Sequence, residues 1–385
     1  MNLSFTRLLL SPLAAALVLT APDRLQAEHI MDSVDALTST LAGTQSQFER
    51  GDFSDAVTTS QKAVQLAQDR FGPLHPSVAP YFDNLAVVDQ ALARYADAES
   101  NFKWALALRE KSLGSMDPAV ASSLVSLAYL EEQLGRFEEA DLSVQRALAI
   151  EKSSKTTSVL IMADSLMLAE DIQDHLGADN QAVSYLKQAL LETTGSGSDL
   201  GPVQAQALTR LAGFETTQKN FTQAESHLQQ ALQITQKTAA PTDIRIADAL
   251  KSLADFYAVT GNQLKANDFY TQTLSRDLHY IGVEDTYSNI PYHQRGADAY
   301  FALGQWKDAE ALDQRILKIK IQVYGPAHPE VALSLESLAQ TEQRLQNKAE
   351  AVKDLKSALE ILKKYFSPDH PLVQDAQNRL AALLK

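Results

Sequence analysis

The sequence has no cysteine, which excludes disulfides, thiolate nucleophiles and cysteine-ligated zinc. It is also short of positive charge: 34 Lys and Arg stand against 48 Asp and Glu, giving a formal net charge of −14 over 385 residues. Nucleic acid and anionic lipid are bound by clustered Lys and Arg, so neither is an expected partner. Basic or neutral polar partners are favoured instead.

Motifs for catalysis are missing as well. The eight histidines form no H-E-x-x-H pattern. The sequence also gives no support for a Ser-His-Asp catalytic triad. The segment GSGSDLG at 195–201 lacks the preceding strand and the Lys that a phosphate loop needs, so we interpret it as a link that is either a plain loop or a hinge. We expect no enzyme activity, no cofactor and no metal; a hydrolase that uses groove carboxylates is a remote alternative.

The N-terminus has the layout of a secretory signal peptide. MNLSFTR carries one basic side chain, LLLSPLAAALVLT is apolar but too short to span a bilayer, and Leu25-Gln26-Ala27 precedes a polar segment that starts at Glu28. We predict a signal peptide at 1–27, cleaved after Ala27. The mature protein is then secreted or periplasmic with no membrane insertion; a cytoplasmic protein with an amphipathic or disordered N-terminus is the alternative.

A small residue recurs at a spacing of 42, with one gap of 43, through the rest of the chain. The members of this series are Ala56, Ala98, Ala140, Ala182, Ala224, Ala266, Ala309 and Ala351. A second small-residue series lies twelve residues earlier: Ala86, Ala128, Ala212, Ala254, Ala297 and Ala339. Small residues let two helices approach closely. Between the series lies a turn that often contains Gly, and Val, Ile and Thr never alternate long enough for a strand. The sequence therefore predicts repeated helix pairs and an all-α fold.

Each pair is joined to the next by a recurring link. It reads ALALREKSLGSMDPAV at 105–120 and AVQLAQDRFGPLHPSV at 63–78, with related segments at 316–331 and 358–373. Gly suits the end of the long second helix, and Pro suits the first turn of the next helix. Asp117 is the expected N-cap, and His75, His328 and His370 occupy the same place.

This framework resembles the tetratricopeptide repeat, and the long unit with its link is similar to the kinesin-light-chain subclass. The resemblance covers about residues 32–385. It implies a right-handed solenoid of about eight helix pairs with a C-terminal capping helix at 372–384. The predicted pairs span about 32–71, 77–114, 119–155, 159–195, 202–238, 243–282, 287–325 and 330–367. The groove asparagine of the family is present at Asn84 but is replaced at Arg210 and Arg295.

The resemblance also implies that the first helix of each pair lines a concave groove. At its outward positions we predict an acidic and aromatic binding site made of Asp83, Tyr129, Glu132, Asp171, Asp174, Asp255, Asp298 and Phe301. The predicted function is a non-enzymatic scaffold or adaptor that binds a protein or an extended peptide there. One specialised alternative is a component of an envelope, polysaccharide or outer-membrane assembly machine. Another is that the acids only keep the groove solvated, and the oligomeric state stays open.

Overall fold

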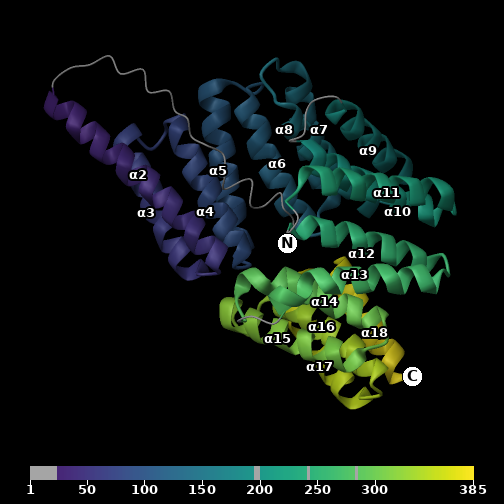
Figure 1. Ribbon diagram of the computed structural model, residues 1–385. Helices are drawn as coiled ribbons and strands as arrows, with labels where there is room; N and C mark the ends of the chain where they lie inside the picture. The colour runs from purple at the N-terminus through teal and green to yellow at the C-terminus, as the bar shows by residue number, and fades with distance from the viewer. Residues whose placement is uncertain (1–23, 195–199, 241–242, 282–284) are drawn as a thin grey trace. The chain divides into compact units, whose positions relative to one another are not determined.

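The computed structural model describes residues 24–194, 200–240, 243–281 and 285–385, with side chains from Leu37 onward. Among these residues every regular element is helical, and none is a strand, so the all-α prediction is confirmed (Figure 1). The helices divide into two compact units. Unit 1 holds residues up to Gln133 together with Leu142–Thr156, and unit 2 holds Leu134–Asp141 together with Thr157–Lys385.

Unit 1 begins with two helix pairs and the first helix of a third. Its helices are α2 (Arg24–Arg50), α3 (Phe53–Phe71), α4 (Ala79–Ala91), α5 (Tyr95–Leu113) and α6 (Pro118–Gln133), with a 3-10 turn η1 (Pro76–Val78). Consecutive helices contact one another in this order. Helix α7 (Phe137–Ser153) begins in unit 2 and ends in unit 1.

Unit 2 repeats the same arrangement through the rest of the chain. Its helices are α8 (Val159–His175), α9 (Asp179–Thr193), α10 (Gly201–Thr217), α11 (Phe221–Thr238), α12 (Ile244–Val259), α13 (Gln263–Ile281), α14 (Ile290–Ala302), α15 (Trp306–Tyr324), α16 (Pro329–Arg344), α17 (Lys348–Tyr365) and α18 (Pro371–Leu384), with a 3-10 turn η3 (Tyr287–Asn289). From α8 to α18 each helix contacts the next, so the unit is an α-solenoid built from local contacts.

The first 23 residues, and most of the predicted signal peptide with them, lie outside the described residues. Cleavage after Ala27 stays a prediction. None of the described helices is both long enough and apolar enough to cross a membrane. The predicted loop or hinge in the Gly-rich link falls on residues 195–199, which also lie outside the described residues.

The 42-residue series forms the tightly packed seam of the helix pairs. All eight of its alanines have no measurable solvent exposure. A side chain larger than Ala at such a position would force the helix axes apart. In the pair α8/α9 the small position of the first helix is taken by Glu170, which is buried and accepts a hydrogen bond from Arg210 Nη1 at 2.5 Å.

The links behave as their sequences predict. Gly72, Gly114 and Gly325 end their helices with φ of 88°, 91° and 85°, a region that suits glycine. Asp117 Oδ1 accepts a hydrogen bond from Ala119 N at 2.8 Å. The His328 and His370 Nδ1 atoms accept from backbone N–H groups at 3.1 and 3.2 Å. The histidine rings also stack on Tyr324 and Phe366, with ring centroids 4.4 and 4.2 Å apart.

Candidate functional site

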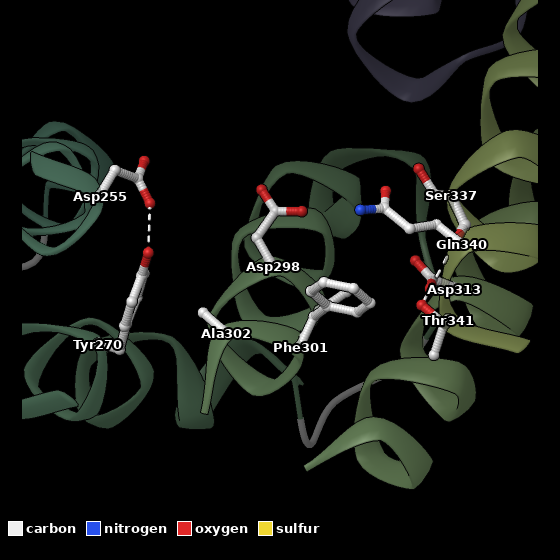
Figure 2. A pocket seen from close by; sticks show the side chains of 10 residues that line it. Asp255, Tyr270, Asp298, Phe301, Ala302, Asp313, Ser337, Gln340 and Thr341 are labelled. Atoms are coloured by element: carbon white, nitrogen blue, oxygen red, sulfur yellow. Dashed lines mark hydrogen bonds between the residues drawn. The ribbon is translucent and has the colours of Figure 1, made fainter. Parts of the chain in front are cut away.

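A pocket opens in unit 2 between the first helices α12, α14 and α16 (Figure 2). Its volume is about 220 Å³. The walls combine carboxylates with two aromatic rings and several neutral polar groups. The lining residues are Asp255, Tyr270, Ala297, Asp298, Phe301, Ala302, Asp313, Ser337, Gln340 and Thr341.

Asp255 and Asp298 lie on the neighbouring first helices α12 and α14, and Lys251 bridges their carboxylates. The Lys251 Nζ lies 2.9 Å from Asp255 Oδ2 and 3.6 Å from Asp298 Oδ2. Tyr270 Oη donates a 2.6 Å hydrogen bond to the other oxygen of Asp255. Both carboxylate side chains keep about half of their surface exposed, so they remain open to a ligand.

Asp313 lies deeper in the pocket. It is 3% exposed, and its Oδ2 accepts a 2.8 Å hydrogen bond from Thr341 Oγ1. Burial raises the pKa of Asp313 to about 6, while the Thr341 hydrogen bond works in the opposite direction. Above that pH the pocket holds a third negative charge next to Asp298.

Burial and the neighbouring charges also act on Asp298 and on Lys251. Burial raises the pKa of Asp298, and Lys251 opposes this. Burial disfavours the charged form of Lys251, but Asp255 and Asp298 outweigh it and raise the pKa of the ammonium group. One cation is therefore shared by two carboxylates, and with ionised Asp313 the pocket carries an excess of negative charge.

Phe301 supplies the aromatic wall. Its ring is partly exposed, and the Arg344 guanidinium lies over it, 5.6 Å from the ring centroid. A cation at that distance is attracted by the negative face of the ring. The pocket thus presents carboxylates and a ring that accepts cations.

The structure brings together only part of the predicted site. Asp255, Asp298 and Phe301 line one pocket. Asp171 instead forms an ion pair with Arg210, and Asp174 is exposed near the end of α8. Neither residue lines the pocket.

The other three predicted residues belong to unit 1. Asp83 is partly buried, and Arg109 Nη1 lies 2.6 Å from its Oδ2. Burial raises the pKa of Asp83, and Arg109 opposes the shift. Tyr129 is 7% exposed and Glu132 is partly exposed. None of these three residues lines the pocket of unit 2.

Sequence reasoning missed Tyr270 and Asp313, which reach the pocket from the second helices α13 and α15 (Figure 2). Both lie four residues after the small alanine of their helix. At that register the other second helices, from α3 on, carry Ser60, Phe102, Val144, Leu186, Leu228 and Leu355. A carboxylate at a mostly apolar, buried register was the available clue to Asp313.

Solved structures with a similar fold include the apo form of the quorum sensor NprR from B. thuringiensis, at 13% identity, with coverage of 88% of this chain and 94% of that one and a TM-score of 0.57. The apo form of RapI is similar at 12% identity, over 74% of this chain and 98% of that one, with a TM-score of 0.52. A tetratricopeptide repeat protein from Parabacteroides merdae matches at 17% identity, over 80% and 99%, with a TM-score of 0.46. At these identities the likeness shows the fold alone.

A comparison with curated proteins gives no match. The family model of the tetratricopeptide repeat matches residues 44–111, 84–153, 203–278 and 290–364, which together make up more than half of the sequence. The chain belongs to the tetratricopeptide repeat family.

Proposed function

We propose that the protein is a non-enzymatic binding scaffold that holds a basic, extended peptide or protein segment on the first-helix surface of unit 2. The observation that carries the proposal is the pocket that Asp255, Asp298 and Asp313 line together with the ring of Phe301. Tetratricopeptide repeats are typical of protein-binding scaffolds, and the quorum sensor NprR and RapI share the fold.

The chemistry of the pocket favours a cationic side chain. Three carboxylates stand against Lys251 and the Arg344 guanidinium over Phe301, which leaves one negative charge uncompensated. The Phe301 ring attracts cations, and an alkyl stem can also pack against it. A partner with Lys or Arg next to an apolar residue would satisfy both. The acidic net charge of the whole chain adds long-range attraction for such a partner.

The cellular location belongs to the proposal as well. The N-terminal layout supports export to the periplasm or beyond, and the link sequences support the kinesin-light-chain-like subclass of repeats. Fractionation of cells that express the full sequence, with N-terminal sequencing of the product, tests export. A product that keeps residues 1–27 inside the cell would contradict it.

Binding is tested with synthetic unstructured peptides of equal length that are rich in Arg and Lys, neutral, or rich in Asp and Glu. Fluorescence anisotropy should show that only the basic set binds, and that added salt weakens binding. Asp298→Asn and Asp313→Asn should each weaken it by roughly 1 kcal/mol, a factor of about five. Because Asp313 gains a proton below a pKa of about 6, acidification should also weaken the wild-type complex.

Glu360→Gln is the matched control, since this carboxylate is exposed on α17, outside the pocket. It should leave affinity unchanged. Equal affinity for the three peptide sets, or equal losses from Glu360→Gln and Asp298→Asn, would overturn the proposal.

A further inference from the structure

A polar contact recurs within the helix pairs at the repeat spacing. In three pairs a carboxylate on the first helix meets a donor twelve residues later on the second helix. These contacts are Asn101 Nδ2 to Asp89 Oδ2 at 3.1 Å, Ser143 Oγ to Glu131 Oε2 at 2.8 Å, and His227 Nδ1 to Glu215 Oε2 at 2.8 Å. Each pair therefore combines a carboxylate, which accepts a hydrogen bond, with a side chain that can donate one.

The last helix pair departs from this pattern. The same register gives Glu342 on α16 and Asp354 on α17, which are both carboxylic acids. Three residues earlier in each helix, Ala339 and Ala351 share one core cluster, so the spacing of twelve again places the two positions on facing sides. Glu342 is 6% exposed, and its Oε2 has no hydrogen-bond partner among the described residues.

The groups around Glu342 do not supply the missing cation. Helix α16 packs against α15 and α17, and its Ala339 shares a core cluster with Leu383 of α18. From α15 and α17, Glu310, Glu350 and Asp354 act on Glu342 as negative charges, and Lys353 is the opposing cation. Lys353 is largely exposed and lies 3.3 Å from Glu350, so its charge is already shared. An ionised Glu342 would be a buried charge among like charges, which is costly.

We propose that Glu342 and Asp354 share one proton, so that the contact between α16 and α17 tightens on acidification through neutrality and loosens in alkaline solution. In the protonated pair the Glu342 carboxyl donates to the Asp354 carboxylate. When that proton is released to solvent, two carboxylates are left facing each other.

The titration behaviour agrees with this geometry. Burial, and then Asp354, Glu310 and Glu350, raise the pKa of Glu342 to about 7. Burial also raises the pKa of Asp354, against Lys353. Both pKa values are higher in the folded chain than in the unfolded chain, so the folded pair keeps its proton up to a higher pH. The penalty is absent in acid, grows as the pH rises through the folded pKa, and is complete in alkaline solution.

The Glu342–Asp354 pair can affect the pocket because α16 contributes to both. Ser337, Gln340 and Thr341 of α16 form one wall of the pocket, and Thr341 directly precedes Glu342. Loosening of α16 above neutral pH would thus reach the pocket wall. The inference does not depend on what the pocket binds.

A reciprocal exchange of partners tests the proposal in the full chain. Asp354→Asn gives the last pair the donor that Asn101 supplies in α5, and Asn101→Asp gives Asp89 the carboxylate that Glu342 faces. Hydrogen–deuterium exchange, read on peptides from α16 and α17 or from α4 and α5, is compared between variant and wild type at each pH. This comparison cancels the intrinsic dependence of exchange on pH.

At about pH 8, Asp354→Asn should slow exchange in α16 and α17 by on the order of tenfold, and at about pH 5 it should change little. Asn101→Asp should do the reverse in its own pair: faster exchange in α4 and α5 at the higher pH and little effect at the lower. An Asp354→Asn effect that is equal at both pH values, or absent, overturns the proposal. So does an Asn101→Asp chain that is destabilised equally at both.

Discussion

At the scale of single residues, the fold depends on alanines that have no space around them. Ala224 is fully buried and shares a core cluster with Ala212 and Leu228. Ala224→Leu should therefore lower the free energy of unfolding by about 1–3 kcal/mol through overpacking. Gln223→Leu adds an equally large apolar side chain at the exposed neighbouring position, and should change stability by less than about 0.5 kcal/mol. Urea denaturation measures both, and similar losses would show that Ala224 is not the close contact.

The residue scale also shows what sequence could and could not predict. The alanine series, the glycines that end the helices and the capping roles of Asp117, His328 and His370 follow from local rules, and the structure confirms them. The pocket depends on which neighbours meet across helices. The resemblance to the repeat family pointed to the first helices, so the second-helix Asp313 was missed.

At the scale of elements, one buried arginine connects three helices through ion pairs. Arg295 on α14 donates to both oxygens of Asp277 on α13, at 2.7 and 2.8 Å, and to Asp248 on α12 at 2.7 Å. Arg295 is 4% exposed and Asp277 is 1% exposed. The sequence marked Arg295 as a departure from the asparagine of the family, but could not show that the guanidinium turns inward to an acid 18 residues earlier.

Removal of one partner should cost more than removal of both. Arg295→Met leaves the Asp277 carboxylate buried without its cation, and should destabilise unit 2 by about 3–5 kcal/mol. The loss should be greater in alkaline than in acidic solution, because burial already raises the pKa of Asp277 and Arg295 opposes that shift. The double variant Arg295→Met/Asp277→Leu should recover most of the stability.

Urea denaturation at several pH values measures this cycle. The exposed pair Lys364–Glu360, 3.4 Å apart, is the control, and Lys364→Met should cost less than about 1 kcal/mol. A double variant as unstable as Arg295→Met alone would mean that the arginine contributes packing rather than charge.

At the scale of the whole molecule, many carboxyl groups are buried in an already acidic chain. Burial is the main cause that raises the pKa of Asp89 and Asp313 to about 6, and of Glu170, Glu336 and Glu342 to about 7. Each of these groups binds its proton more tightly in the folded state than in the unfolded chain. The folded state therefore carries more protons between about pH 4 and 7, and stability falls as the pH rises through that window.

Other groups limit this trend without reversing it. Hydrogen bonds and ion pairs lower the pKa of Asp243 and Glu225, so these acids favour the folded state above their unfolded pKa. Burial lowers the pKa of His293, which is fully buried, so stability is also lost when acid forces a proton onto the ring. We therefore expect maximum stability in mildly acidic solution.

Urea denaturation at fixed ionic strength, from about pH 5 to 8, should give a midpoint that decreases up to about pH 7 and then levels off. Glu336→Gln and Glu342→Gln together should flatten the curve by raising its alkaline end, because both remove a buried charge that the folded state disfavours. Glu360→Gln removes an exposed charge and should leave the slope unchanged. A midpoint that rises with pH would mean that the paired carboxylates dominate over the buried ones. The buried carboxyl groups at the helix interfaces would then contribute less to the pH dependence of stability than the carboxylates in ion pairs.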